Sequence, residues 1–233
     1  VYHGEIYNHL ELRRELEATG ETFQTHSDTE VLLAAVATWG PKEALSRCNG
    51  MWAFVLLDTE RRRLLIARDR FGVKPLYVWR DGRGSLLLAS EIKALLPHPA
   101  VRAAADAEAC ASFLRDGPQA WREATEFEGI TRFPPGHWLE LPLDAVTSAW
   151  APQPYWQRPP AGDPDEPFDA AKATALTERY AAHLGDAVRL RLRADVRLGT
   201  ALSGGLDSSS IVSLVNAQLR ALGRDEQQET FSS

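Results

Sequence analysis

The segment 203–209 carries the residue types of a phosphate-binding loop. It reads Ser-Gly-Gly-Leu-Asp-Ser-Ser and follows an apolar run, 196–202, that predicts a buried strand. Two glycines let the backbone approach a ligand closely. Apolar residues at helical spacing follow the loop, and a helix there would offer free N–H groups and the positive end of its dipole. Ser203, Ser208 and Ser209 add hydroxyl donors. The arrangement predicts a nest for phosphate or pyrophosphate.

Asp207 is the residue of this loop that does not fit a simple phosphate site. A carboxylate repels phosphate unless a cation lies between them, and Mg²⁺ binds through few carboxylates together with substrate phosphates. The loop has neither the Gly-Lys-Ser/Thr ending of a Walker A motif nor the Gly-x-Gly-x-x-Gly of a dinucleotide site. We therefore expect Mg²⁺ at Asp207. The alternative is that Asp207 caps the following helix.

The first hundred residues alternate short amphipathic helices and strands. Asn8–Glu11 has the form of a capping box, and Ser27–Glu30 repeats it, so a helix is expected after each. Short apolar runs separated by polar turns then predict four strands, paired as hairpins, at 51–57, 64–67, 76–80 and 86–89. Antiparallel hairpins together with amphipathic helices predict a layered α+β domain.

The second half of the chain reads as a strand-poor stretch, a linker and a new domain. A helix at 106–115 and a strand at 138–141 are expected, and a segment rich in proline, glycine and acid follows them. Beyond it, Leu176, Tyr180, Leu184 and Val188 recur every four residues and predict one face of a helix. We expect domains at 1–157 and 168–233, joined by a linker at 158–167.

Several segments, in one order and spacing, resemble glutamine-dependent asparagine synthetases. Ser203–Ser209 resembles the pyrophosphate loop of ATP pyrophosphatases, and 192–202 is similar to the lead-in of that loop in the synthetases. The first half resembles their glutaminase domain in the segments Gly4–Asn8, Ser27–Glu30, Gly50–Phe54, Ala67–Tyr77, Ala89–Lys93 and Phe133–His137. The resemblance covers nearly the whole chain.

The resemblance implies a two-site enzyme. Its first domain is a class II amidotransferase with an α+β N-terminal-nucleophile hydrolase-type (αββα) sandwich, which releases ammonia from glutamine. Its second is an α/β PP-loop domain of the adenine nucleotide α hydrolase-like type, of which this chain would hold the start. That domain adenylates aspartate with Mg-ATP, and ammonia then displaces AMP. Glutamine, aspartate and ATP are the expected small-molecule partners, with ATP and Mg²⁺ as cofactors.

Site residues follow from the resemblance position by position. Gly4 and Glu5 match the glutamine-site motif, in which the glycine N–H serves the oxyanion hole and the glutamate holds the polar end of the substrate. Asp28 matches the aspartate that pairs with the α-ammonium of glutamine. From the residues alone, Asp28 would be a helix N-cap and Glu5 a solvated loop carboxylate. In the second domain, the matching ATP-binding residues are Leu202, Ser203, Gly204, Gly205, Leu206, Asp207, Ser208 and Ser209.

Two departures from the family pattern concern the glutaminase. His3 stands where the family has an asparagine of the oxyanion hole, so its imidazole either replaces that donor or marks a weakened site. The family nucleophile is an N-terminal cysteine, and this chain begins at Val1 with no such residue. We therefore expect a piece of a longer protein that lacks both ends. Cys48 and Cys110 are interpreted as core residues.

Two other functions compete with the synthetase. One is a related ATP-dependent amide ligase or cyclase, such as a β-lactam synthetase or lasso-peptide cyclase, with a degenerate glutaminase domain. The other is a pseudo-amidotransferase that serves as a binding platform. The coding sequence upstream of Val1 discriminates them, because a cysteine directly after the initiator methionine selects the synthetase.

Composition excludes several classes. Acidic residues outnumber basic ones, 32 to 26, which argues against a nucleic-acid binder. No apolar run approaches the roughly 18–20 residues of a membrane span. Two cysteines form no disulfide framework or thiolate metal site, so a cytoplasmic location is expected. The oligomeric state stays open, a homodimer included.

Overall fold

The computed structural model describes residues 1–119, 122–145, 150–163, 167–194, 196, 198–223 and 228–232. The chain divides into two units, Val1–Pro159 and Pro160–Ser233. The division falls inside the expected linker 158–167, of which residues 164–166 lie outside the described part.

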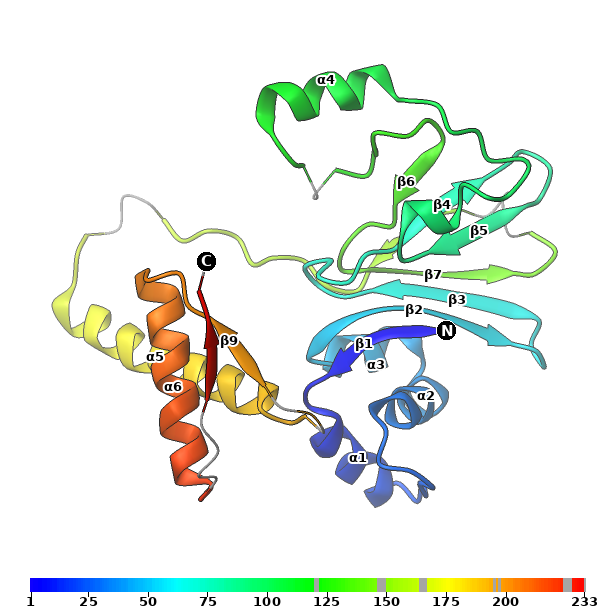
Figure 1. Cartoon of the computed structure of the whole chain (residues 1–233). Helices are drawn as coiled ribbons and strands as arrows, with labels where there is room; N and C mark the ends of the chain where they lie inside the picture. The colour runs from blue at the N-terminus through cyan, green and yellow to red at the C-terminus, as the bar shows by residue number, and fades with distance from the viewer. Residues whose placement is uncertain are drawn as a thin grey trace. The chain divides into compact units, whose positions relative to one another are not determined.

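An antiparallel sheet of five strands is the centre of the first unit (Figure 1). Its order is β1-β2-β3-β7-β8, which places β1 at an edge. The strands are β1 (Tyr2–Ile6), β2 (Gly50–Asp58), β3 (Arg63–Arg68), β7 (His137–Pro142) and β8 (Gln153–Pro154). One face of this sheet is covered by the helices α1 (His9–Ala18), α2 (Asp28–Trp39) and α3 (Pro41–Arg47).

A second antiparallel sheet covers the opposite face. Its order is β5-β4-β6, built from β4 (Tyr77–Arg80), β5 (Leu86–Ala89) and β6 (Ile130–Arg132). The 3-10 helix η1 (Ile92–Ala94) and the helix α4 (Ala107–Asp116) lie beyond this sheet. The layer order of helix, sheet, sheet and helix confirms the predicted αββα sandwich.

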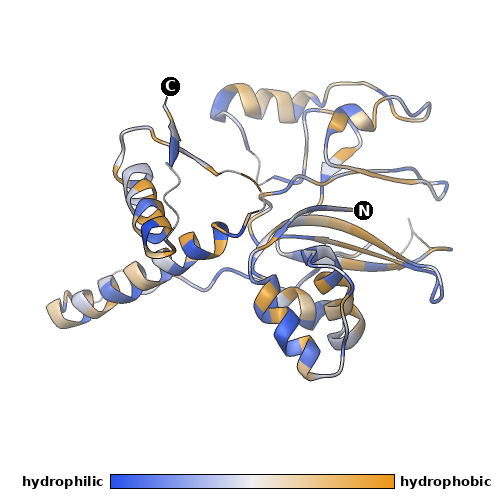
Figure 2. Ribbon diagram, turned by 60° about the horizontal axis from the view of Figure 1, so that its bottom comes forward, coloured by the Kyte–Doolittle hydropathy of each residue, from blue (hydrophilic) through white to orange (hydrophobic). Residues whose placement is uncertain are grey.

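Strand alternation divides the core into layers. In β2, Trp52 and Phe54 belong to the cluster under the helices, whereas Ala53 belongs to the cluster between the two sheets. In β3, Leu65 joins the first cluster and Ile66 the second. Because successive side chains of a strand point to opposite faces, these two central strands are apolar on both sides. Figure 2 shows the hydropathy of each residue along the ribbon.

The predicted caps of the first two helices had different outcomes. Ser27 caps α2, since its hydroxyl accepts from Thr29 N at 3.2 Å. The capping box at Asn8 was wrong, because no side-chain capping bond forms there. Instead Asn8 Nδ2 donates to Arg47 O at 3.0 Å, and Asn8 Oδ1 accepts from Asn49 N at 2.8 Å. Asn8 therefore ties the start of α1 to the α3–β2 junction.

The second unit contains α5 (Ala170–Arg191), β9 (Gly199–Ala201), α6 (Leu206–Ala221) and β10 (Glu229–Phe231). The strands β9 and β10 pair in parallel around α6, which gives the expected strand, loop and helix order. Val188, Leu192 and Val215 form the buried cluster between α5 and α6. This core is small.

One expectation for the second unit was wrong, and another was right about the helix without fixing its burial. The buried strand at 196–202 is a shorter strand, β9, with Gly199 and Ala201 exposed, because β10 is its one neighbour among the described strands. The apolar face of α5 is buried at Val188, but Leu176 and Tyr180 are 48% and 68% exposed. Helical periodicity located the apolar face but could not show how much of it is covered.

Candidate functional site

The edge of β1 that faces away from β2 is where the candidate glutamine-site residues meet. Val1 and Val55 exchange both backbone hydrogen bonds, and Tyr7 N donates to Asn49 O. Paired residues of an antiparallel ladder alternate between bonded and non-bonded pairs. Gly4 and Ile6 therefore occupy non-bonded positions opposite Trp52 and Gly50, and their N–H groups point away from β2.

Gly4 lies too close to β2 to carry a side chain. A Cβ at this position would lie 2.2 Å from Met51 O and 2.6 Å from Trp52 Cα. Gly50 is constrained in the same way, because its Cβ would lie 2.1 Å from Glu5 O. These two glycines let β1 and β2 approach each other, and this contact fixes the position of the Gly4 amide at the edge.

Asp28 reaches the same edge from the first turn of α2. Its Oδ2 accepts from Ile6 N at 2.9 Å and from the Tyr2 hydroxyl at 2.7 Å. Its Oδ1 receives only a 3.5 Å contact from the Thr29 hydroxyl among the described residues. The alternative that Asp28 is the N-cap is wrong, because Ser27 holds that position. The carboxylate thus lies two residues along β1 from the Gly4 N–H.

His3 and Glu5 lie on the opposite face of β1 from Tyr2 and Ile6. Both side chains are exposed, whereas Ile6 is buried under the helices. Glu5 belongs to a strand, so the alternative of a loop carboxylate is wrong. The structure therefore brings His3, Gly4, Glu5 and Asp28 to one short strand and its edge.

Two buried neighbours in sequence, Arg68 and Asp69, lie at the end of β3 and support β2 on the side away from β1. Asp69 Oδ2 accepts from Trp52 N and Lys74 N, and its Oδ1 accepts from Phe71 N and Val73 N, at 3.0–3.2 Å. Arg68 donates to three carbonyl oxygens of the surrounding loops, those of Gly72, Lys74 and Phe133. Asp69 thus anchors the backbone of Trp52, the residue opposite Gly4.

The two cysteines lie in different surroundings. Cys48 is buried in the core under the helices, which confirms its expected place. Burial raises the pKa of the Cys48 thiol to about 12, against a smaller opposing effect of the Arg70 guanidinium. Cys110 is half-buried, and its Sγ contacts Glu126 O at 3.8 Å. At neutral pH Cys48 is a neutral thiol and a poor nucleophile.

The loop between β9 and α6 is a turn whose two ends are joined by hydrogen bonds of serine hydroxyls. Gly204 has a φ of +81°, a conformation that favours glycine. Ser208 Oγ accepts from Ser203 N at 3.3 Å and contacts Ser203 Oγ at 3.1 Å. Gly205 is the N-cap of α6 and provides no side-chain cap. The first N–H groups of α6 therefore open toward solvent at this loop.

Asp207 lies in the first turn of α6, so the alternative that it caps this helix is wrong. It is exposed, as are Leu206 and the two glycines before it. Leu202 precedes the loop, and its N–H donates to Phe231 O at 2.8 Å. Among the described residues no group of three or more histidine, cysteine, aspartate or glutamate side chains is arranged to hold a metal.

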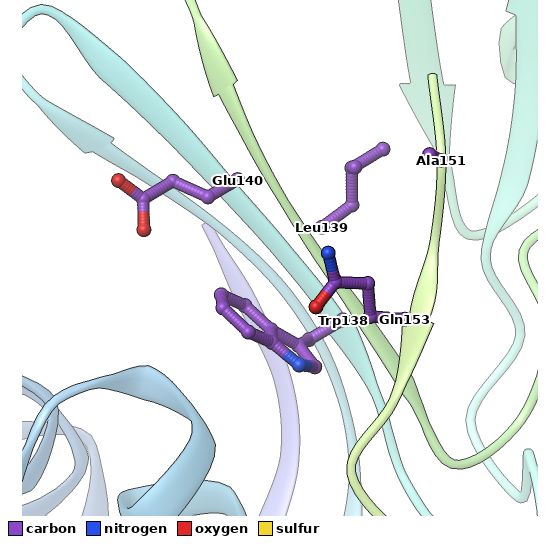
Figure 3. Close-up of a pocket in the computed structure, with 5 residues that line it drawn as sticks. All are labelled: Trp138, Leu139, Glu140, Ala151 and Gln153. Carbon is purple, nitrogen blue, oxygen red and sulfur yellow. The ribbon is translucent and has the colours of Figure 1, made fainter. Parts of the chain in front are cut away.

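Two hollows of the first unit lie away from the candidate glutamine site. A groove of about 660 Å³ runs between α2, α3 and the outer half of the β2–β3 hairpin, lined by residues that include Leu33, Leu57 and Arg63. A smaller one of about 130 Å³ lies beside β7 and β8, where Trp138 and Gln153 pair across the strands (Figure 3). Neither lining includes Gly4 or Asp28.

Sequence reasoning missed the contact between Tyr2 and Asp28. Alternation along β1 places Tyr2 on the same face as Ile6, toward the helices, and α2 begins at Asp28. The alternation of the strand therefore indicated which way Tyr2 faces, but nothing in the sequence indicated how α2 is placed against β1.

In the described part of the chain, none of the helices combines the length and apolar character needed to cross a bilayer.

Comparison with known proteins adds two family matches. Residues 1–156 match the model described as glutamine amidotransferase domain, and residues 179–233 match the one described as asparagine synthase. Asparagine synthetase (glutamine-hydrolyzing) 3 of Bacillus subtilis (strain 168) is 36% identical over 224 residues, which cover 96% of this chain and 34% of that protein. Amidase chyE of Penicillium rubens is 36% identical over 223 residues, 94% of this chain and 31% of that protein.

The chain thus spans about a third of the length of these curated relatives. A solved structure of glutamine phosphoribosylpyrophosphate amidotransferase from B. subtilis, complexed with ADP and GMP, is 21% identical and aligns with a TM-score of 0.44. That alignment covers 100% of this chain and 44% of the other.

Proposed function

The chain belongs to the glutamine amidotransferase domain family, and from this premise we propose that its first unit binds glutamine along the edge of β1 that faces away from β2. The observation that carries the proposal is the position of the Asp28 carboxylate, bonded to Ile6 N on the same edge as the Gly4 N–H. Residues two apart on a strand are separated by about 6.4–6.8 Å. An anion and a hydrogen-bond donor at that spacing suit a ligand with an ammonium group at one end and an amide carbonyl at the other.

Each candidate residue then has a distinct role. Asp28 pairs with the α-ammonium through a charge-assisted hydrogen bond. The Gly4 N–H donates to the amide oxygen as negative charge develops on it, and the His3 imidazole adds a second donor. Glu5 holds the polar end of the substrate. Attack on the amide carbon requires a nucleophile other than Cys48, whose thiol keeps its proton at neutral pH.

We further propose that the loop of the second unit binds the phosphates of ATP. The free N–H groups at the start of α6 and the hydroxyls of Ser203 and Ser208 are the donors that support this. Asp207 fits Mg²⁺, since its exposed carboxylate stands beside donors suited to phosphate and Mg²⁺ joins these two kinds of group. When bound, Mg²⁺ would offset phosphate charge.

The whole reaction we propose is that of a glutamine-hydrolysing asparagine synthetase. Aspartate and ATP give β-aspartyl-AMP and pyrophosphate, and ammonia from glutamine displaces AMP to give asparagine. The support for this reaction is the order of the two family matches along the chain and the relative from B. subtilis.

Glutamine binding to wild type and to Asp28→Asn, measured by titration calorimetry, tests the first part. Asparagine keeps one carbonyl oxygen, which can accept from both Tyr2 and Ile6, but it presents an NH₂ group where Oδ1 stood. We expect the fold to persist and glutamine affinity to fall at least about tenfold, since a charge-assisted contact is replaced by two facing donors.

Asp81→Asn is the matched control. Asp81 Oδ1 alone accepts from Arg83 N and Ser85 N in a hairpin turn, so the amide retains these bonds. Glutamine affinity should not change in this variant. Equal affinity of wild type and Asp28→Asn would reject the glutamine site.

A related amide ligase or cyclase with a weakened glutaminase is the second candidate. The observations that favour it are His3 in place of the family asparagine, and the amidase relative, which is 36% identical, as the synthetase relative is. Ammonia release distinguishes the two: a protein that includes the coding sequence upstream of Val1 should hydrolyse glutamine if it is a synthetase, and should not if its glutaminase is degenerate.

A further inference from the structure

Tyr2 and Asp28 form a contact that the proposed glutamine site does not by itself require. The Tyr2 hydroxyl donates to Asp28 Oδ2 at 2.7 Å, and Ile6 N donates to the same oxygen at 2.9 Å. Tyr2 is half-buried and packs against the core under the helices, so its ring is held in place. Two donors from one strand therefore meet on one oxygen of a side chain that comes from α2.

This arrangement leaves the two oxygens of Asp28 unequal. Oδ2 accepts two short hydrogen bonds, whereas among the described residues Oδ1 has only the 3.5 Å contact from Thr29. A carboxylate held at one oxygen by two donors from different directions cannot rotate freely about its Cβ–Cγ bond. Oδ1 is thereby kept available in one orientation.

The hydroxyl remains a donor over the working pH range. Burial, together with the hydrogen bond to Asp28, raises the pKa of Tyr2 well above its ordinary value. A neutral phenol donating to an ionised carboxylate is a strong type of hydrogen bond, roughly twice as strong as one between neutral groups.

We infer that Tyr2 is a positioning residue that orients the Asp28 carboxylate so that Oδ1 receives the α-ammonium of the substrate. Tyr2 itself makes no substrate contact in this scheme. Its hydroxyl converts a mobile surface carboxylate into a preorganised one, which lowers the cost of ordering that side chain on binding. The inference rests on the proposed glutamine site and adds to it a determinant of selectivity for α-amino acids over deaminated analogues.

The test compares two ligands that differ only at the group in question. Glutaramate is glutamine with the α-ammonium replaced by hydrogen. NMR titrations of the chain with glutamine and with glutaramate are made for wild type and Tyr2→Phe. Phenylalanine keeps the ring and its packing and removes only the hydroxyl. We expect glutamine binding to weaken about 3- to 10-fold, the usual effect of one hydrogen bond, and glutaramate binding to stay unchanged.

Tyr155→Phe is the matched control. Tyr155 is a buried tyrosine of this unit, and its hydroxyl donates to Arg68 O at 3.0 Å, away from Asp28. Both variants lose one hydroxyl donor, so both should lower the thermal midpoint, Tyr2→Phe by the larger amount because its acceptor is a carboxylate. Only Tyr2→Phe should change the ratio of the glutamine and glutaramate affinities.

A double-mutant cycle completes the design. In the Asp28→Asn background, Tyr2→Phe should not reduce the preference for glutamine further, because no anion is left to orient. Equal weakening of both ligands by Tyr2→Phe, or an undiminished preference for glutamine, would overturn the inference while the glutamine site stands. If wild type shows no preference for glutamine over glutaramate, the proposed glutamine site itself fails.

Discussion

Gly4 lies directly opposite Trp52 across the β1–β2 pair, with no space between the two backbones for a β-carbon. Trp52 is in turn held on the side of β2 away from β1, because its N–H donates to the buried Asp69 carboxylate. A chain of short contacts therefore runs from the end of β3 through β2 to the edge of β1 that faces away from β2. The position of the Gly4 amide depends on each of these contacts.

Gly4→Ala should both destabilise the first unit and weaken glutamine binding. The added methyl group meets Met51 O and Trp52 Cα, neither of which can move without distorting the sheet. We expect a loss of about 1–3 kcal/mol in unfolding free energy, the range for an overpacked site, measured by urea denaturation. Gly82→Ala is the control, since nothing lies within 4 Å of a Cβ there. A Gly4→Ala variant as stable as wild type would contradict the close packing.

Asp69→Asn should lower the unfolding free energy of the first unit by at least about 2 kcal/mol. Each oxygen of Asp69 accepts from two backbone N–H groups, so either orientation of an amide turns its NH₂ toward two donors. Asp81→Asn should have a smaller effect, because one oxygen accepts both backbone hydrogen bonds. Chemical denaturation of the two variants side by side provides the comparison, and equal stabilities would reject this account.

Cys48 gives the unfolding free energy a distinct dependence on alkaline pH. The unfolded thiol ionises near pH 9, whereas burial holds the pKa of folded Cys48 near 12. Between these values the unfolded chain binds fewer protons, so stability falls as pH rises, by up to about 1.4 kcal/mol per pH unit. The slope should be shallower in Cys48→Ala by that amount. Identical slopes in the two proteins would mean that Cys48 ionises in the folded state.

His3→Asn should raise glutamine hydrolysis in a protein that carries the catalytic nucleophile. His3 is exposed beside Gly4, and asparagine restores the amide donor of the family at that position. Loss of one oxyanion donor typically costs about 10²–10³ in rate, of which the imidazole replaces a part. Steady-state ammonia release gives the answer. A rate that does not rise would show that His3 is not a deficient oxyanion donor.

Asp207→Ala should impair nucleotide binding without unfolding the second unit. Asp207 is exposed in the first turn of α6, and the cap of this helix is Gly205. The carboxylate is therefore not needed for capping, but its removal takes away the proposed Mg²⁺ contact. Binding of Mg-ATP, followed by calorimetry beside the thermal midpoint, separates these effects. Unchanged affinity for Mg-ATP would remove Asp207 from the site and leave only the backbone donors.

The sequence allowed the strands and helices of the first unit to be predicted because its apolar pattern is local, whereas the order of its layers followed from the family resemblance. The apolar runs of β2 and β3 and the cap at Ser27 are properties of neighbouring residues, and each has its counterpart in the structure. Asn8 was different. Its side chain bonds to Arg47 and Asn49, some forty residues away, and no local pattern predicts which of two available partners an amide will choose.

The candidate site was predictable in its residues but not in its connections. The motif containing Gly4 and the later Asp28 pointed to a common ligand, and α2 does bring Asp28 to the edge of β1. The bond from Tyr2 and the anchoring of Trp52 by Asp69 depend on the register between elements, which composition and spacing do not contain. In the second unit, periodicity marked the apolar face of α5 but not its exposure, since burial depends on what packs against it.

The parallel pair of β9 and β10 has a consequence for how the chain behaves in concentrated solution. Each strand has the other as its one neighbour among the described strands, and Phe231, the last residue of β10, is 64% exposed. A ribbon of two strands offers peptide groups along both margins, where a strand of another molecule can add. The net charge of −6 keeps molecules apart at long range but does little at contact distance in salt. Solubility of this chain should therefore be limited by strand addition at this ribbon, and salt that screens the mutual repulsion should promote association.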